Sequence, residues 1–178
     1  MSIERAEKKL REAQFFLDKM RDQHARAFGD KEPIDFYLSA FLNAAKTVDY
    51  MLARATGQGK RAKRTYEHWR KVWERGLPAP SAVLHEFLAI DRDLEVHDAG
   101  SQRVAGTTEL PMHNSEYSDA SGTLQVSAAI CTPYPAATLQ KPRYTFTIDG
   151  VEREAAEACA AYLELVKQKV ARFIADGP

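Results

Sequence analysis

The first 55 residues contain two long runs in which mostly apolar residues recur at alternating steps of three and four. This spacing places the recurring positions on one stripe of an α-helix, as in an amphipathic helix that buries one face. In the first run these positions are Ile3, Ala6, Leu10, Ala13, Leu17, Met20, His24 and Ala27. In the second run they are Ile34, Leu38, Phe41, Ala45, Val48, Leu52 and Ala55. Gly29 ends the first run and Pro33 suits the first turn of the next helix, so we expect two long helices packed as an antiparallel hairpin.

Three further helices are expected after this hairpin. A third helix, at about 62–75, carries on one face Tyr66, Trp69 and Trp73. A fourth helix begins near Pro80 or Ser81, after a break rich in glycine and proline. Its stripe is Val83, Phe87, Ile90, Leu94 and, in the same phase, His97. The last helix, at about 153–175, has the stripe Ala155, Cys159, Tyr162, Val166, Val170 and Phe173.

The segment at 98–150 differs from the rest, with many Gly, Ser, Thr and Pro residues and no helical period. Residues 123–130 (TLQVSAAI) and 143–148 (RYTFTI) alternate apolar with polar or small side chains, which predicts two strands with one buried face each. Pro133, Pro135 and Pro142 lie between them, so we expect a loop there and not a tight turn. The polar stretch 100–122 has no assignable pattern. The sequence thus predicts a mainly α fold: an antiparallel bundle of four to five helices, with a small β-strand insertion before the last helix.

Charge and cysteine content narrow the class of protein. The chain has 25 basic and 25 acidic residues, so no overall field attracts it to nucleic acid or membrane, and polyanion binding requires a local patch. Its first residues lack an apolar secretory signal, and no apolar run approaches the roughly 20 residues that span a bilayer. Cys131 and Cys159 stand among apolar neighbours, which favours buried thiols over a disulfide. These features predict a cytoplasmic protein with no membrane partner.

The residue spacings of common metal and cofactor sites are absent from the sequence. There is no Glu-x-x-His pair of a di-iron bundle, no HExxH motif, and there are too few cysteines for a zinc site. A Gly-rich phosphate loop and a G-x-S-x-G nucleophile motif are also missing. We interpret four histidines as surface or packed residues rather than ligands: His24, His68, His85 and His113. We therefore expect no metal and no cofactor.

Arg92 and His97 stand out at the end of the apolar fourth helix. Histidine exchanges a proton near neutral pH, and arginine donates in a fork that matches phosphate oxygens. Together they supply the minimum for metal-free RNA cleavage: proton transfer and stabilisation of charge on the phosphoryl group. On a continuous helix, five residues separate the two positions by about 140°. They can converge only if the helix ends or bends near residues 94–97, or if a second copy of the chain completes the site. The structural alternative is that Arg92 favours the helix C-terminus electrostatically and His97 packs there.

RDLEVH (residues 92–97) resembles the R-[N/D/H]-x-x-x-H motif of the HEPN superfamily of helical bundle proteins. The resemblance implies one HEPN-like domain over residues 1–178, with an insertion at about 98–150. It also implies a metal-independent endoribonuclease of toxin–antitoxin or defence type, acting on RNA as a homodimer, with an antitoxin protein as a further partner. Arg92 would then contact the phosphate, Asp93 would be the polar residue after the arginine, and His97 would be the acid/base. The alternative is a non-catalytic helical module for dimerisation or partner binding.

The one strongly basic stretch is GQGKRAKRTYEHWRKVWER, at 57–75. If it binds RNA, the residues that track phosphates are Lys60, Arg61, Lys63, Arg64, Arg70 and Lys71. The structural alternative is a solvated helix face whose interleaved aromatic residues belong to the core. In that alternative, the first few charges suit the C-terminal end of the second helix.

Overall fold

The computed structural model describes residues 2–25, 31–97, 103–111, 118–119, 122–123 and 138–178, with side chains for 3–25, 32–89 and 144–178 and the backbone alone for the others. Five α-helices fill most of the described chain: α1 (Ser2–Ala25), α2 (Lys31–Ala55), α3 (Gly59–Arg75), α4 (Ala79–His97) and α5 (Ala155–Asp176). A small β-sheet precedes α5. The mainly α bundle with a β insertion before the last helix, as expected from the sequence, is therefore confirmed.

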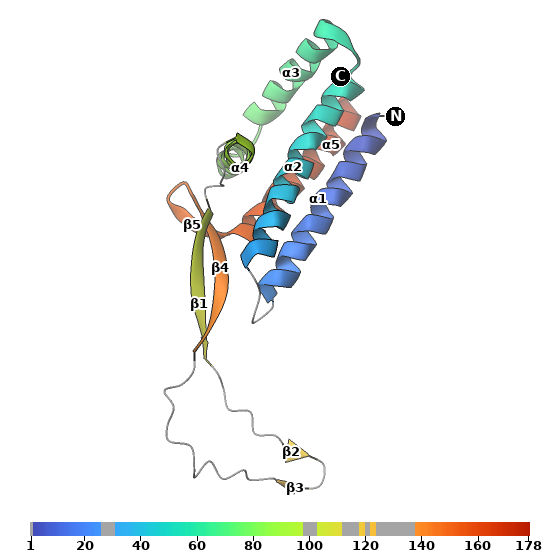
Figure 1. Ribbon diagram of the computed structural model, residues 1–178. Helices are drawn as coiled ribbons and strands as arrows, with labels where there is room; N and C mark the ends of the chain where they lie inside the picture. Colours follow the sequence, from blue (N-terminus) through green and yellow to red (C-terminus); the bar gives the residue numbers. More distant parts are fainter. Residues whose placement is uncertain (1, 26–30, 98–102, 112–117, 120–121, 124–137) are drawn as a thin grey trace.

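α1 and α2 form the expected antiparallel hairpin, and α5 runs alongside both of them (Figure 1). The stripes predicted from the three- and four-residue spacing are the ones that pack. On α1 the fully buried members are Ala6, Ala13, Leu17 and Met20. On α2 they are Ile34, Leu38, Phe41, Ala45, Val48 and Leu52. Each helix turns one apolar stripe inward. Burial of this stripe stabilises the helix, which would be only marginally stable from helix propensity alone.

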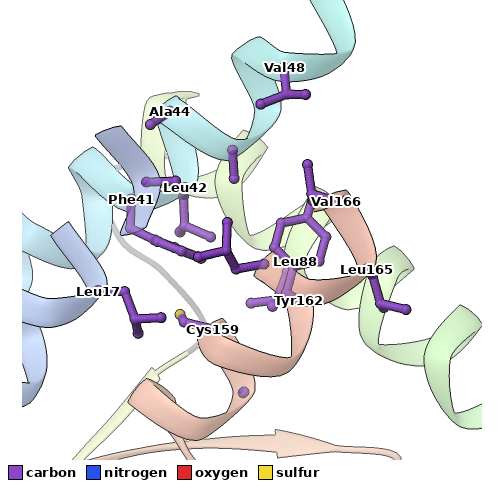
Figure 2. Packing of buried hydrophobic residues seen from close by; sticks show 14 of the residues in the cluster. Leu17, Phe41, Leu42, Ala44, Val48, Leu88, Cys159, Tyr162, Leu165 and Val166 are labelled. Carbon is purple, nitrogen blue, oxygen red and sulfur yellow. The ribbon is translucent and has the colours of Figure 1, made fainter. Parts of the chain in front are cut away.

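The centre of the core draws on four helices. Figure 2 shows Leu17 of α1, Phe41 of α2, Leu88 of α4 and Tyr162 of α5 converging in one apolar cluster. Cys159 lies in the same cluster with no exposed surface, so the prediction of a buried thiol is confirmed for this residue. The other cysteine, Cys131, lies outside the described residues.

α3 is attached to the bundle by two polar contacts beneath its aromatic face. The hydroxyl of Tyr66 donates to Oδ1 of Asp49 on α2 at 2.9 Å. Nε1 of Trp69 donates to Oδ2 of Asp176 at the end of α5 at 2.8 Å. Tyr66 and Trp69 are buried, as expected from the sequence, and Phe173 of α5 packs against both rings.

Three antiparallel strands make the sheet, in the order β1 (Arg103–Pro111), β4 (Thr138–Ile148) and β5 (Val151–Glu154). A separate short pair consists of β2 (Ser118–Asp119) and β3 (Gly122–Thr123). Asp149 and Gly150 join β4 to β5 with φ angles of 52° and 72°. Two consecutive positive φ angles define the Asp-Gly hairpin turn whose twist suits antiparallel strands.

The β insertion departs from the sequence expectations in several ways. β1 occupies the stretch that had no assignable pattern, and Val151–Glu154 is a strand although the last helix was expected from about 153. Pro142, which the sequence predicts in a loop, lies inside β4, opposite Thr107 of β1. β5 pairs with 145–148, so among the described strands none lies on the other side of β4 at this proline, which lacks an N–H donor. Of the strand expected at 123–130, all but the first residue lies outside the described part.

The predicted strand at 143–148 is confirmed, because it forms the bundle-side half of β4. Tyr144, Phe146 and Ile148 of this strand are buried, and the ring of Phe146 meets Phe87 of α4 edge-on. The sheet is therefore joined to the helical core through β4. Among the described helices, none combines the length and apolarity that crossing a bilayer requires.

Candidate functional site: a charged cleft between four helices

The residues predicted from the HEPN resemblance all lie in the last two turns of α4. The helix continues through His97, so positions 92 and 97 stay about 140° apart around its axis. The helix ends at His97, within the range in which an end was expected. The side chains of Arg92, Asp93 and His97 lie outside the described ones, and their contacts stay predictions.

A row of exposed basic side chains follows the outer face of α3. We call it the α3 basic row, and it consists of Lys60, Arg64, Lys71 and Arg75. These positions fall within about 60° around the helix axis and span about 22 Å along it. None of the four makes an ion pair with another residue whose side chain is described. The α3 segment carries seven basic and two acidic residues, whereas the whole chain is neutral, so positive charge is concentrated on this helix.

The other predicted basic residues lie beside this row or away from it. Arg61 and Lys63 are exposed on its two flanks, and Lys63 lies 3.8 Å from a carboxylate oxygen of Glu67. Arg70 is only half-exposed, and its Nε lies 3.6 Å from Oε1 of Glu74. Arg70 therefore belongs to a second feature, a cleft on the bundle side of α3.

This cleft has a volume of about 390 Å³ and lies where α2, α3, α4 and α5 meet. Its charged walls come from three helices: Lys46 and Asp49 of α2, Arg70 and Glu74 of α3, and Glu86 of α4. Its size falls in the range of small-molecule sites, which is about 300–1,000 Å³. Sites between helices of a bundle are a recurring place for ligands.

Beneath the cleft, Asp49 is the centre of a buried polar cluster. Its Oδ1 lies 2.6 Å from Nζ of Lys169 on α5 and also accepts the hydrogen bond from Tyr66. Burial alone would raise the pKa of Asp49, but the Lys169 charge and the hydrogen bonds outweigh it and lower this pKa below 3.8. Burial lowers the pKa of Lys169, although the Asp49 charge opposes this effect. The pair thus forms a buried ion pair that joins α2 to α5.

Lys169 is nearly inaccessible to solvent, with 1% of its side chain exposed. Its Nζ lies 4.8 Å from the centre of the Trp73 ring, close enough for a cation–π contact. The carboxylate of Asp49 is the partner of this ammonium, and the hydrogen bond between them is one cause of the lowered pKa of Asp49. Nε of Arg70, also buried, has no hydrogen-bond acceptor among the described residues. One cationic group at this site therefore has an unused donor.

His85 of α4 lies between two aromatic rings at the cleft wall. Its ring centre is 5.5 Å from that of Trp73 and 5.8 Å from that of Tyr162. Burial, reinforced by the positive charge of Lys169, lowers the pKa of His85 to about 4. The imidazole is therefore neutral at physiological pH, where one nitrogen can donate and the other can accept. Burial also raises the pKa of the Tyr162 phenol, which keeps its proton.

Sequence reasoning missed this cleft, although one signal for it was present. Lys169 lies on the apolar stripe of α5, three residues after Val166 and one before Val170. A lysine on a buried stripe requires a partner, because lysine is almost never buried unpaired. The partner, Asp49, follows the fully buried Val48 on α2 and has no sequence link to α5.

Neither a metal-binding cluster nor a known relative identifies this site. Within the described residues, no group of three or more His, Cys, Asp or Glu side chains is arranged to hold a metal ion. Comparison of the chain with known protein families, with curated proteins and with solved structures gives no match. The function must therefore be argued from the charges and geometry of the chain itself.

Proposed function

We propose that this protein binds RNA through the α3 basic row and, as an HEPN-like homodimer, cleaves it with Arg92 and His97. The observation that supports RNA binding is the row itself. Four cations on one exposed face, none ion-paired to a described side chain, suit a chain of phosphates, because neutralising phosphates releases bound counterions. Because these charges are concentrated on one helix of a protein with no net charge, RNA is attracted to α3 rather than to the whole surface.

The catalytic part of the proposal depends on two copies of the chain. Positions 92 and 97 lie on different sides of one continuous helix, so Arg92 of one protomer would have to act with His97 of the other. Arg92 would hold the phosphate and His97 would transfer the proton, with Asp93 as the polar residue beside the arginine. An antitoxin protein that covers this site is a further proposed partner.

Cleavage of a structured RNA by the purified protein tests the catalytic part. The expected result is cleavage that persists in a chelator and is lost in both His97→Ala and Arg92→Ala. Mixing these two inactive variants should restore part of the activity, because a mixed dimer holds one site with an intact arginine and an intact histidine. Equal cleavage by the wild type and both variants would assign the activity to a contaminant.

A non-catalytic module for dimerisation or partner binding is the second candidate. The course of α4 supports it, because the helix runs through positions 92 and 97 and places them about 140° apart around its axis. Sedimentation equilibrium separates the two candidates. A monomer at all concentrations excludes the composite nuclease site, and a dimer that binds RNA without cutting it supports the non-catalytic module.

A further inference from the structure

The cleft between α2, α3, α4 and α5 presents both signs of charge to the same small volume. Lys46 and Arg70 supply positive charge, and Glu74 and Glu86 supply negative charge. Lys46 and Glu86 make no ion pair or hydrogen bond with another residue whose side chain is described, so their charges are available at the rim. Lys46, Arg70 and His85 line the same cleft, and the positive charges of Lys46 and Arg70 contribute to the lowered pKa of His85.

These charges limit the kind of ligand that fits. A phosphate or other polyanion would meet the carboxylates of Asp49, Glu74 and Glu86 in the same cleft, and like charges repel. An uncharged apolar ligand would remove the rim charges from water without pairing them, at a large cost in free energy. A bare metal ion lacks a suitable group of ligands in the described part of the chain. A molecule that carries one positive and one negative charge can pair with groups of both signs in the cleft.

We propose that this cleft binds a small zwitterion with one carboxylate and one ammonium group, of the class of free α-amino acids. The carboxylate lies against Lys46 and Arg70, and the ammonium lies against Glu86, because Glu74 already lies 3.6 Å from Nε of Arg70. Nε of Arg70, which is buried and has no acceptor among the described residues, then gains one. Charge-assisted hydrogen bonds of this kind are shorter and stronger than neutral ones.

The remaining walls suit the rest of such a ligand. A short apolar strip for its side chain is formed by Leu77, Ala82 and Ala89. His85 and Tyr162, both uncharged at neutral pH, also line the cleft and offer hydrogen-bonding groups. The volume of about 390 Å³ leaves room for a free amino acid and some water. Because the cleft joins four helices, bound ligand stabilises the whole bundle.

Thermal unfolding of the full chain with each standard free L-amino acid at millimolar concentration tests the proposal. At least one amino acid should raise the melting temperature and bind by calorimetry. Its N-acetyl derivative, which lacks the ammonium, and its amide, which lacks the carboxylate, should each bind at least about tenfold more weakly, because each loses one charge-assisted contact. Inorganic phosphate should have no effect.

Two variants of rim residues locate the site. Lys46→Gln and Glu86→Gln should each weaken binding about tenfold or more, since each removes one charge partner. Lys8→Gln and Glu7→Gln, at exposed positions of α1, remove the same charges elsewhere and should leave binding unchanged. Three results would overturn the proposal: no response to any amino acid, equal binding of the acetylated or amidated form, or equal loss in the α1 variants. None of these results depends on RNA binding.

Discussion

Nζ of Lys169 lies 2.6 Å from Oδ1 of Asp49, and this contact joins the middle of α5 to α2 beneath the cleft. The two partners differ in exposure, because 1% of the Lys169 side chain and 19% of the Asp49 side chain reach solvent. Removing one partner of a buried ion pair typically costs about 3–5 kcal/mol. We expect Asp49→Asn to lower the free energy of unfolding by this amount and Lys169→Met by less, since water in the cleft can solvate a carboxylate left at Asp49. Urea denaturation measures both.

The double variant checks that this loss comes from the pair. Asp49→Asn combined with Lys169→Met leaves no unpaired buried charge, so its loss should be clearly smaller than the sum of the two single losses. Strict additivity of the two losses would mean that the ion pair does not couple α2 to α5.

His85 should make the stability of the fold depend on pH below neutrality. Its pKa is about 4 in the folded chain, against 6.5 without the protein environment. Between these values the unfolded chain binds a proton that the folded chain does not, so the free energy of unfolding falls as the pH falls from 6.5 to 4. The loss is at most about 3 kcal/mol. Because the pKa of Asp49 lies below 3.8, its own contribution is lost only at more acidic pH.

Urea denaturation at a series of pH values measures this effect, with two variants as controls. His85→Gln should flatten the curve between pH 6.5 and 4, because it removes the titrating group. His68→Gln, at an exposed position of α3, should leave the slope as in the wild type. If the slope of stability against pH is the same in all three proteins, the inference that His85 is buried in its neutral form is wrong.

The sheet should depend on one aromatic residue for its attachment to the bundle. Phe146 of β4 has no exposed surface, and its ring centre lies 5.4 Å from that of Phe87 on α4. Phe146→Ala should lower the free energy of unfolding by about 3–5 kcal/mol, as expected for truncating a buried aromatic residue. Thr147→Ala, at the exposed next position of the strand, is the matched control and should change it by less than about 0.5 kcal/mol. Similar values for the two variants would show that β4 does not pack on the core.

The sequence predicts the helices well because their signal is local and repeated. Leu38, Val48 and Leu52 each recur in phase with several other apolar residues, so an error at one position does not change the result. The strands gave weaker signals. The Asp149-Gly150 pair between Ile148 and Val151 is a typical hairpin sequence, but β5 is only four residues long and leads directly into α5. Its apolar pattern is too short to be separated from the start of a helix.

The cleft was beyond sequence reasoning for a different reason. Lys46, Arg70, Glu86 and Tyr162 come from four helices, and their spacing along the chain follows no motif. They are brought together only by the angles at which the helices pack, which hydrophobic periodicity does not determine. For Arg92 and His97, in contrast, the spacing along the chain is itself the signal that identifies the pair. The contacts of their side chains stay predictions.

The α3 basic row gives the proposed RNA binding a measurable dependence on salt. For single-stranded RNA, the logarithm of the binding constant falls with the logarithm of salt concentration by about 0.7 for each phosphate neutralised. Four cations in the row predict a slope near −3. Arg64→Gln should weaken binding of unrelated RNA sequences alike and reduce the steepness by about 0.7. Fluorescence anisotropy across a range of salt concentrations measures both quantities.

Lys167→Gln on α5 provides the control, because it removes one cation away from α3. Lys167 already lies 2.7 Å from a carboxylate oxygen of Glu164, so its charge is partly neutralised within the fold. Loss of the Lys167 charge should leave the salt dependence of RNA binding unchanged if RNA lies along the α3 basic row. An equal change of slope in the two variants would indicate diffuse attraction to the protein as a whole, and RNA would then have no defined path along α3.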